Sequence, residues 1–211
     1  KKLIKVDIIH NFRKNDLDFN GNGAPISPIY HKFLMENKKL KLPSCFINIG
    51  GISNITYLDA NQLIGFDIGP GNCLIDRVVK DTLGKNFDKN GELAFKGKVN
   101  YKKLNILLRD DYFKLDFPKS LDKNHFNKYL NIFNDDQIED IIATLSTFTI
   151  KSIERQILSF KQIPNNCLIS GGGLKNNFIY NGLKKIKQIN FIPPKELNIN
   201  PETLEAEMIC Y

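Results

Sequence analysis

The sequence predicts an α/β fold in which helices flank a mixed β-sheet. Three observations predict it. A Gly-Gly pair separates two β-branched runs, as in a hairpin, and two later apolar runs each lead through a glycine turn into a helical pattern. The chain has 211 residues, 42% of them hydrophobic. This is enough to form one hydrophobic core, or one core and part of a second.

The first segment combines a possible strand, a long loop and a helix. Residues 3–9 favour a short strand, and residues 30–42 favour a helix. Between them, residues 11–28 form a polar stretch rich in glycine and proline, with Arg13 and Asp16 among its charged members. Its length suggests a function, although a solvated linker between lobes is the alternative.

The hairpin is the first candidate binding feature. Residues 45–49 and 52–58 are strand-like, and Gly50 and Gly51 form the turn between them. Such a turn exposes backbone N–H groups, and Ser53 and Asn54 add side-chain donors, so a phosphate could bind there. Most Gly-Gly hairpins bind nothing, and that interpretation stays open.

The second glycine turn carries a carboxylate. A strand at residues 62–66 leads to Asp67 and an Ile-Gly-Pro-Gly-Asn turn, and a helix is expected at about residues 73–83. Asn72 is the expected N-cap, and Gly84 ends the helix. Asp67 either faces a ligand or caps its own glycine turn, and its position alone favours the cap.

The second half of the sequence predicts a helix near Tyr101, an amphipathic helix over residues 136–160 and two more strands. Lys119 lies in the loop at residues 114–120 and is either a phosphate contact or an ordinary solvated lysine. The spacing of the three histidines indicates neither a metal site nor a catalytic dyad: His10, His31 and His125.

The strand at residues 167–170 runs directly into Gly171, Gly172 and Gly173, and a helix follows at about residues 176–187. This strand, glycine turn and helix let a nucleotide lie against the backbone, although three glycines alone are weak support. After a strand at residues 188–192, Pro201 is expected to start the last helix. Glu205 in that helix has the pattern of an ordinary surface residue.

Charge and cysteine usage exclude several classes of protein. The net charge of +7 comes mainly from lysines that are scattered along the chain, whereas specific nucleic-acid readers favour arginine. The four cysteines lie far apart, without a CxxC pair, so we interpret them as reduced core residues of a cytosolic protein. The sequence has no apolar run of the roughly 18 residues that a membrane span needs, and no signal peptide.

Taken in order, these patterns resemble the second half of an actin-like, sugar-kinase-type ATPase, in which two ribonuclease-H-like lobes close on a nucleotide. Seven segments resemble the anhydro-N-acetylmuramic acid kinase family: NIGGISNIT (48–56), GFDIGPGNCLID (65–76), FDKNGELAFKG (87–97), PKS (118–120), ATL (143–145), SGGGLKN (170–176) and LEA (204–206). The loop NFRKNDLDFNGNGAP is similar to the FR, D and GAP elements of the family. The resemblance spans essentially the whole chain.

This resemblance implies a cytoplasmic enzyme of cell-wall recycling that uses ATP, Mg²⁺ and water. It would open 1,6-anhydro-N-acetylmuramic acid and give N-acetylmuramic acid 6-phosphate and ADP. It also implies a homodimer in the full-length protein, with neither nucleic acid nor membrane as a partner. Residues 1–42 would be an inter-lobe loop and connecting helix at the end of the first lobe, and residues 43–211 the second lobe.

The resemblance also implies roles for particular residues. Asp67 would be the general base, and Glu205 would help to hold the water. Arg13 and Asp16 would border the sugar pocket or a dimer contact. Residues near the phosphates would be Gly50, Gly51, Ser53, Asn54, Gly69, Gly71 and Asn72. Residues on the adenosine side would be Gly171, Gly172, Gly173 and Asn176. No residue is singled out as a metal ligand.

The sequence departs from the family pattern in places. Asn11 stands where the family has an aspartate, and residues 20–23 and 122–124 replace two other family motifs. The GTSxDG phosphate loop and the HGQT segment of the family are not in this chain, so we expect the 211 residues alone neither to bind ATP tightly nor to turn over. Three alternatives are another actin-like carbohydrate kinase, a non-catalytic ATP-binding or filament-forming relative and, least favoured, a nucleic-acid-binding protein.

Overall fold

The computed structural model describes residues 10–20, 23 and 25–211, so the strand expected at residues 3–9 lies outside the described residues. The strands are β1 (Ser44–Ile49), β2 (Ile52–Leu58), β3 (Leu63–Pro70), β4 (Asn166–Ser170) and β5 (Asn190–Ile192). The helices are α1 (Lys14–Asp18), α2 (Pro28–Asn37), α3 (Cys73–Leu83), α4 (Glu92–Lys96), α5 (Tyr101–Leu108), α6 (Ile138–Leu158), α7 (Asn177–Lys184) and α8 (Leu204–Cys210).

The five strands form one mixed sheet in the order β3-β2-β1-β4-β5. β1 pairs antiparallel with β2, β2 pairs antiparallel with β3, and β1, β4 and β5 run parallel. In the described sheet, β2 alone therefore runs against the other strands. The carboxyl ends of β1, β3, β4 and β5 consequently lie at the same edge of the sheet.

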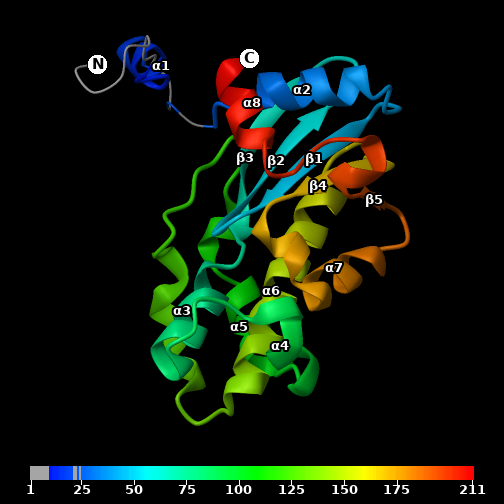
Figure 1. The fold of residues 1–211 in the computed structure, drawn as a ribbon. Helices are drawn as coiled ribbons and strands as arrows, with labels where there is room; N and C mark the ends of the chain where they lie inside the picture. Colours follow the sequence, from blue (N-terminus) through cyan, green and yellow to red (C-terminus); the bar gives the residue numbers. More distant parts are fainter. Residues whose placement is uncertain (1–9, 21–22, 24) are drawn as a thin grey trace, which may run out of the picture.

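Helices cover both faces of this sheet. Figure 1 shows α2 and α8 on one side and the layer containing α3, α5 and α6 on the other, whereas α1 lies outside both layers. Because strand side chains alternate between faces, neighbouring residues enter different cores. Ile47 and Phe66 pack in the larger core with α6, and Phe46 and Leu168 pack in the smaller core with α2 and α8. The predicted α/β fold with a mixed sheet and flanking helices is confirmed.

Several predicted boundaries are confirmed and others shift for local reasons. α3 spans the predicted residues and ends at Gly84, which has a φ of 65°. The helix predicted for residues 30–42 ends earlier, because Lys39 takes a φ of 53° and the Leu40 N–H donates to the Met35 carbonyl. α8 begins at Leu204 and not near Pro201.

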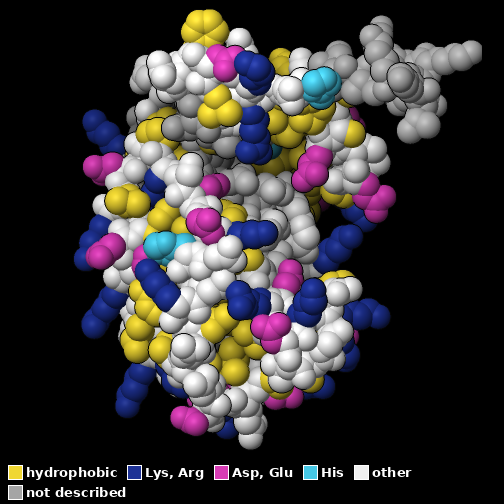
Figure 2. All heavy atoms as spheres, turned by 90° about the vertical axis from the view of Figure 1, so that its left-hand side faces the viewer, with side chains coloured by type: hydrophobic (Ala, Val, Ile, Leu, Met, Phe, Trp, Pro, Cys, Tyr) yellow, Lys and Arg dark blue, Asp and Glu magenta, His cyan; other side chains and the backbone are white. Residues whose placement is uncertain are grey.

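The charged side chains do not form a field of one sign on the face that Figure 2 shows. Basic and acidic side chains are interspersed there, with apolar side chains between them. A duplex-binding surface gathers lysine and arginine along one groove or stripe. The mixed face agrees with the scattered lysines of the sequence.

The cysteines are all free, but they are not all core residues. Cys45 and Cys167 are buried, Cys73 is half-buried and Cys210 is exposed. The prediction of a core position is wrong for Cys210, because it lies near the end of α8 and that helix buries only Leu204.

None of the described helices has both the length and the apolar character needed to cross a membrane.

Candidate functional site

The two glycine turns of the first half of the chain are packed backbone to backbone. The Gly71 N–H donates to the Gly51 carbonyl at 2.9 Å, and the Asn72 N–H donates to the Gly50 carbonyl at 2.8 Å. A Cβ on Gly71 would lie 2.3 Å from the Gly50 oxygen, so only glycine permits this approach. These hydrogen bonds use the Gly71 and Asn72 amides, which are therefore not available to a phosphate in this conformation.

Asn72 does not cap α3 with its side chain, although the sequence predicted that it would. It occupies the N-cap position of α3, but its side chain makes no capping hydrogen bond. Its Nδ2 instead donates to the Gly50 carbonyl at 3.0 Å. The side chain thus joins the two glycine turns, and this long-range contact replaces the local cap.

The third glycine turn lies against the end of β1. Gly171 has a φ of 92°, and a Cβ there would lie 2.5 Å from Asn48 Oδ1. A Cβ on Gly173 would lie 2.3 Å from Ile49 Cγ2, whereas the nearest atom to a Cβ on Gly172 would be Asn72 Nδ2 at 3.9 Å. The fold therefore brings together the three glycine segments that the sequence singled out.

A row of polar residues crosses the sheet at this edge. Asp67 of β3 pairs with Asn54 of β2, Asn54 pairs with Asn48 of β1, and Asn48 pairs with Ser170 of β4. Directly paired residues project from the same face of a sheet. Ser170 Oγ donates to Asn48 Oδ1 at 3.2 Å, which links the last two residues of the row, on β1 and β4. This polar row lies on the face that α2 and α8 cover further along the strands.

A cavity of about 520 Å³ opens at the β4 end of the polar row. Asn48, Ser170, Gly171 and Gly172 line one side of it, and the exposed Glu205 of α8 lies on another. The remaining walls combine apolar, aromatic and charged side chains: Leu174, Lys175, Tyr180, Pro193, Pro194, Lys195, Pro201, Glu202 and Leu204. Its size, its apolar walls and its few polar groups are typical of a small-molecule site.

Asp67 is at the other end of the polar row and does not line this cavity. Its Oδ2 accepts a hydrogen bond from the Leu121 N–H at 2.9 Å. Burial raises the pKa of the Asp67 carboxyl, and the Leu121 N–H opposes that shift. Asp67 and Glu205 are thus at opposite ends of one polar row.

Other residues expected at the phosphates or the adenosine lie behind the surface. Ser53 is buried, and its hydroxyl donates to the Pro70 carbonyl at 3.5 Å. Gly69 packs against Ser152 of α6. Asn176 is buried and caps α7, since its Oδ1 accepts from the N–H groups of Phe178 and Ile179.

Arg13 was expected near the sugar or a dimer contact, and the structure places it away from the glycine turns. Arg13 is exposed and lines a separate hollow with Leu17, Ile26 and Ile209. The Asp16 side chain lies outside the described part of the structure. The structure does not bring Arg13 to the glycine turns.

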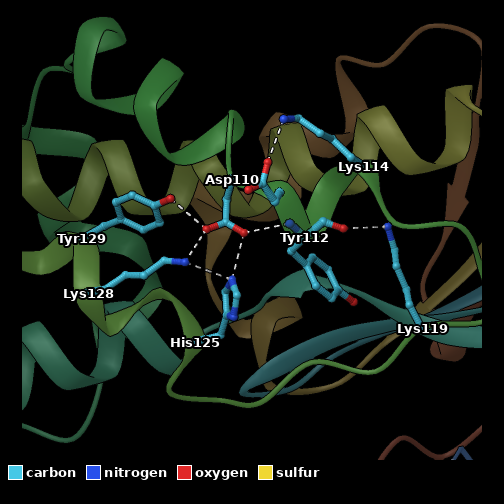
Figure 3. Close-up of polar contacts among 8 residues, drawn as sticks. Asp110, Tyr112, Lys114, Lys119, His125, Lys128 and Tyr129 are labelled. Atoms are coloured by element: carbon cyan, nitrogen blue, oxygen red, sulfur yellow. Dashed lines mark hydrogen bonds and ion pairs between the residues drawn. The ribbon is translucent and has the colours of Figure 1, made fainter.

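The structure also contains a polar cluster that the sequence did not predict (Figure 3). Asp110 is buried and accepts hydrogen bonds from the Tyr112 N–H and the Tyr129 hydroxyl. Lys128 Nζ lies 2.7 Å from its Oδ2, and His125 Nε2 lies 2.8 Å from its Oδ1. Burial alone would raise the pKa of Asp110, but these donors hold it well below its usual range. The five residues are called the Asp110 cluster below.

The Asp110 cluster left no signal in the spacing of its residues. His125 and Tyr129 contact a carboxylate that is 15 and 19 residues earlier in the chain, and an irregular loop separates them. Lys119 was interpreted as a phosphate contact or an ordinary solvated lysine, and its contacts do not fit an ordinary solvated lysine. Its Nζ donates to the backbone carbonyls of Tyr112 and Leu115 at 3.4 and 3.2 Å, and burial lowers its pKa.

The topology and the glycine turns define the class of protein. A sheet in the order β3-β2-β1-β4-β5, with β2 as the antiparallel strand, is the arrangement of a ribonuclease-H-like lobe of the actin-like ATPase type. In such α/β sheets, ligands bind outside the carboxyl ends of the strands.

Comparison with known proteins then gives the family. The profile of the anhydro-N-acetylmuramic acid kinase family matches residues 2–211, and the chain belongs to that family. The resemblance found in the sequence motifs is thus confirmed.

Individual relatives are similar over only part of their length. The chain is 37% identical to the anhydro-N-acetylmuramic acid kinase of Nitrobacter winogradskyi over 87% of this chain and 50% of the relative. It is 34% identical to that of Zymomonas mobilis over 98% of this chain and 56% of the relative. Among solved structures, it is similar to the activator of the 2-hydroxyisocaproyl-CoA dehydratase from Clostridium difficile with bound ADPNP, with a TM-score of 0.49 and 17% identity over 80% of this chain and 59% of the other. The chain therefore spans about half the length of the curated relatives it matches.

Proposed function

We propose that this chain is part of an ATP-dependent kinase that opens 1,6-anhydro-N-acetylmuramic acid with water. The products are N-acetylmuramic acid 6-phosphate and ADP. Membership of the family supports the substrate and the reaction. The observation that carries the proposal within the structure is the polar row, which begins at Asp67 and ends at a glycine-lined cavity.

The reaction needs one base and a phosphoryl acceptor. A water molecule attacks the anomeric carbon, and the bond from that carbon to O6 breaks. O6 takes the γ-phosphoryl group of ATP, and the base takes the proton of the water. Because the leaving oxygen goes to phosphorus, the departing group needs no separate acid, and a single carboxylate is sufficient.

Asp67 is the proposed base. Only its Oδ2 accepts a hydrogen bond from the described residues, so its Oδ1 keeps lone pairs for a water molecule. Burial raises its pKa towards the range in which a carboxylate removes a proton effectively. Glu205 helps to hold the water when the site is closed around its ligands.

ATP is the proposed nucleotide, with the cavity beside Gly171 and Gly172 as its adenosine site and the turn at Gly50 and Gly51 near its phosphates. Apolar walls suit a purine, and backbone N–H groups suit phosphate oxygens. Among the described residues, no group of three or more His, Cys, Asp or Glu is arranged to hold a metal ion. Mg²⁺ often enters a kinase with the nucleotide, bound through phosphates and one or two carboxylates, so this arrangement is compatible with Mg²⁺ use.

The other parts of the proposal follow from the family. They are a cytoplasmic location, a homodimer of the full-length protein, and a division into residues 1–42 at the end of a first lobe and residues 43–211 as the second lobe. Catalysis requires groups of both lobes, since phosphoryl transfer depends on positioning and electrostatic stabilisation from all sides of the phosphates.

The test is the Asp67→Asn variant of the full-length protein, assayed for sugar phosphate formed from the anhydro sugar and ATP. We expect turnover to fall by about 10²- to 10⁴-fold, because that is the typical contribution of a general base. ATP affinity should be largely unchanged, since the adenosine site lies at the far end of the polar row.

Asp81→Asn is the matched control, because Asp81 is an exposed aspartate on α3 that forms an ion pair with Arg77. It should leave turnover unchanged. Full activity of Asp67→Asn would contradict the assigned base. Turnover with plain hexoses, but not with the anhydro sugar, would contradict the substrate and favour another carbohydrate kinase.

A further inference from the structure

We propose that Tyr112 is a positioning residue for Asp67, and that the Asp110 cluster holds Tyr112 in place. The inference rests on the proposed function, because it assigns a purpose to a cluster that the proposed reaction does not otherwise use. It is carried by two hydrogen bonds of Tyr112, one from its N–H to the buried Asp110 carboxylate and one from its hydroxyl to the Asp67 carbonyl.

Asp67 is held from the free edge of the sheet. In the sheet of described strands, β3 lies at the edge, so the N–H and carbonyl of Asp67 that point away from β2 need partners from outside that sheet. The Asp67 N–H donates to the Lys119 carbonyl at 3.0 Å, and the Tyr112 hydroxyl donates to the Asp67 carbonyl at 2.6 Å. With the Leu121 N–H on Oδ2, the loop fixes both the backbone and the carboxylate of Asp67.

Tyr112 is itself fixed at both ends. Its N–H donates to Asp110 Oδ1 at 2.9 Å, and its ring is buried against Phe113 and Phe126. Asp110 in turn contacts His125, Lys128 and Tyr129, which belong to the other end of the loop in sequence (Figure 3). The two ends of the loop around residues 110–129 are therefore joined at one carboxylate.

The middle of the loop is fixed by Phe117 and Lys119. Phe117 stacks on Phe66, the residue before Asp67, with ring centroids 5.0 Å apart and planes at 9°. Lys119 Nζ lies 4.8 Å from the centre of the Tyr112 ring and donates to the Tyr112 carbonyl. Tyr112 thus contacts both the residue that binds the Asp67 N–H and the carboxylate of the cluster.

The consequence is a carboxylate whose two oxygens have different tasks. Leu121 fixes Oδ2, and Oδ1 is left for the water. Losing the Tyr112 hydroxyl frees the Asp67 carbonyl and loosens the loop that carries Leu121. The base is then misplaced relative to the water, and misplacement of a reacting group by about 1 Å can lower a rate by about 10²-fold.

The experiment compares Tyr112→Phe with Tyr57→Phe in the full-length protein. Tyr57 is a matched control, because its hydroxyl also donates from a buried ring to a backbone carbonyl, that of Gln162, at 3.0 Å. We expect Tyr112→Phe to lower kcat about tenfold with the KM for ATP within about twofold of the wild type. Tyr57→Phe should leave both constants unchanged, although each variant loses one hydrogen bond from a buried ring to a backbone carbonyl.

Equal kcat values for the two variants would overturn the inference, as would a loss that appears only in KM. If Tyr112→Phe fails to fold by circular dichroism, Lys119→Met decides, because it removes the contact with Tyr112 and keeps the side-chain stem. A kcat about threefold below the wild type supports the inference in that case, and an unchanged kcat overturns it. Activity of Asp67→Asn equal to the wild type would instead indicate that the proposed function has failed.

Discussion

Asp67 and Asp110 are two aspartates joined by one tyrosine, yet their surroundings differ in almost every respect. Asp110 accepts hydrogen bonds from Tyr112 and Tyr129 and lies within contact distance of the side chains of His125 and Lys128. These four partners lower its pKa although it is buried. Asp67 is half-buried and its carboxylate accepts one backbone N–H, so burial prevails and raises its pKa.

The difference shows how the number of donors separates an anchor from a base. A carboxylate whose lone pairs are all used by donors is held in the ionised form and has no place for a proton. A carboxylate with one donor keeps an oxygen free and binds a proton more readily. The predictions below test this contrast between Asp110 and Asp67, beginning with the largest effect.

The largest effect is expected for the stability of Asp110→Asn. The substitution removes a buried charge from Lys128 and His125 and leaves their donors poorly matched, so the free energy of unfolding should fall by roughly 3 kcal/mol. Asp67→Asn should change the same free energy by less than about 1 kcal/mol, since burial already disfavours the charge of Asp67. Urea unfolding of both variants measures the difference, and equal losses would remove the contrast.

A smaller effect is expected when the pH is lowered. Because the pKa of Asp110 is lower in the folded state than the unfolded value of about 3.9, its contribution is complete above that value and is lost as the pH falls through the folded value. The stability gap between the wild type and Asp110→Asn should narrow by about 1 kcal/mol between pH 5 and pH 3. A gap that widens at pH 3 would mean that the Asp110 carboxylate is not stabilised in its charged form.

The smallest effects should come from the individual donors of Asp110. Tyr129→Phe should lower the free energy of unfolding by about 1.5 kcal/mol, because it leaves a charged acceptor with one donor fewer. Lys128→Gln should cost less than about 1 kcal/mol, because the Lys128 side chain is 53% exposed and water screens its pair. Urea unfolding of the two variants measures these losses. If the cluster depended mainly on the ion pair with Lys128, Lys128→Gln would lower the free energy of unfolding more than Tyr129→Phe.

The elements that the sequence predicted well are those determined by local chemistry. The Gly-Gly turn, the helix between Asn72 and Gly84, and the turn at Gly171 depend on residues that are neighbours in the chain. The polar row could not be predicted, because it requires the register of three strand pairs. The same holds for the Asp110 cluster, whose members meet only after the loop has packed.

Particular side chains show why roles were harder to predict than elements. Asn72 was expected to cap its own helix, yet its amide finds a carbonyl of the hairpin turn, which is distant in sequence. Asn176 was expected on the adenosine side, and the structure shows that its side chain caps α7. The Asn72 amide thus bonds a segment 22 residues earlier in the chain, whereas the Asn176 side chain bonds N–H groups only two and three residues further on.

The loop that holds Asp67 has a second consequence, for the solubility of the protein. An edge strand with unpaired backbone groups is a template on which another chain can add a strand. The Lys119 carbonyl and the Tyr112 hydroxyl occupy the outward-facing groups of β3 at Asp67, in the middle of that strand. Loss of this loop would therefore expose a site for edge-to-edge aggregation at the same residue whose chemistry it serves.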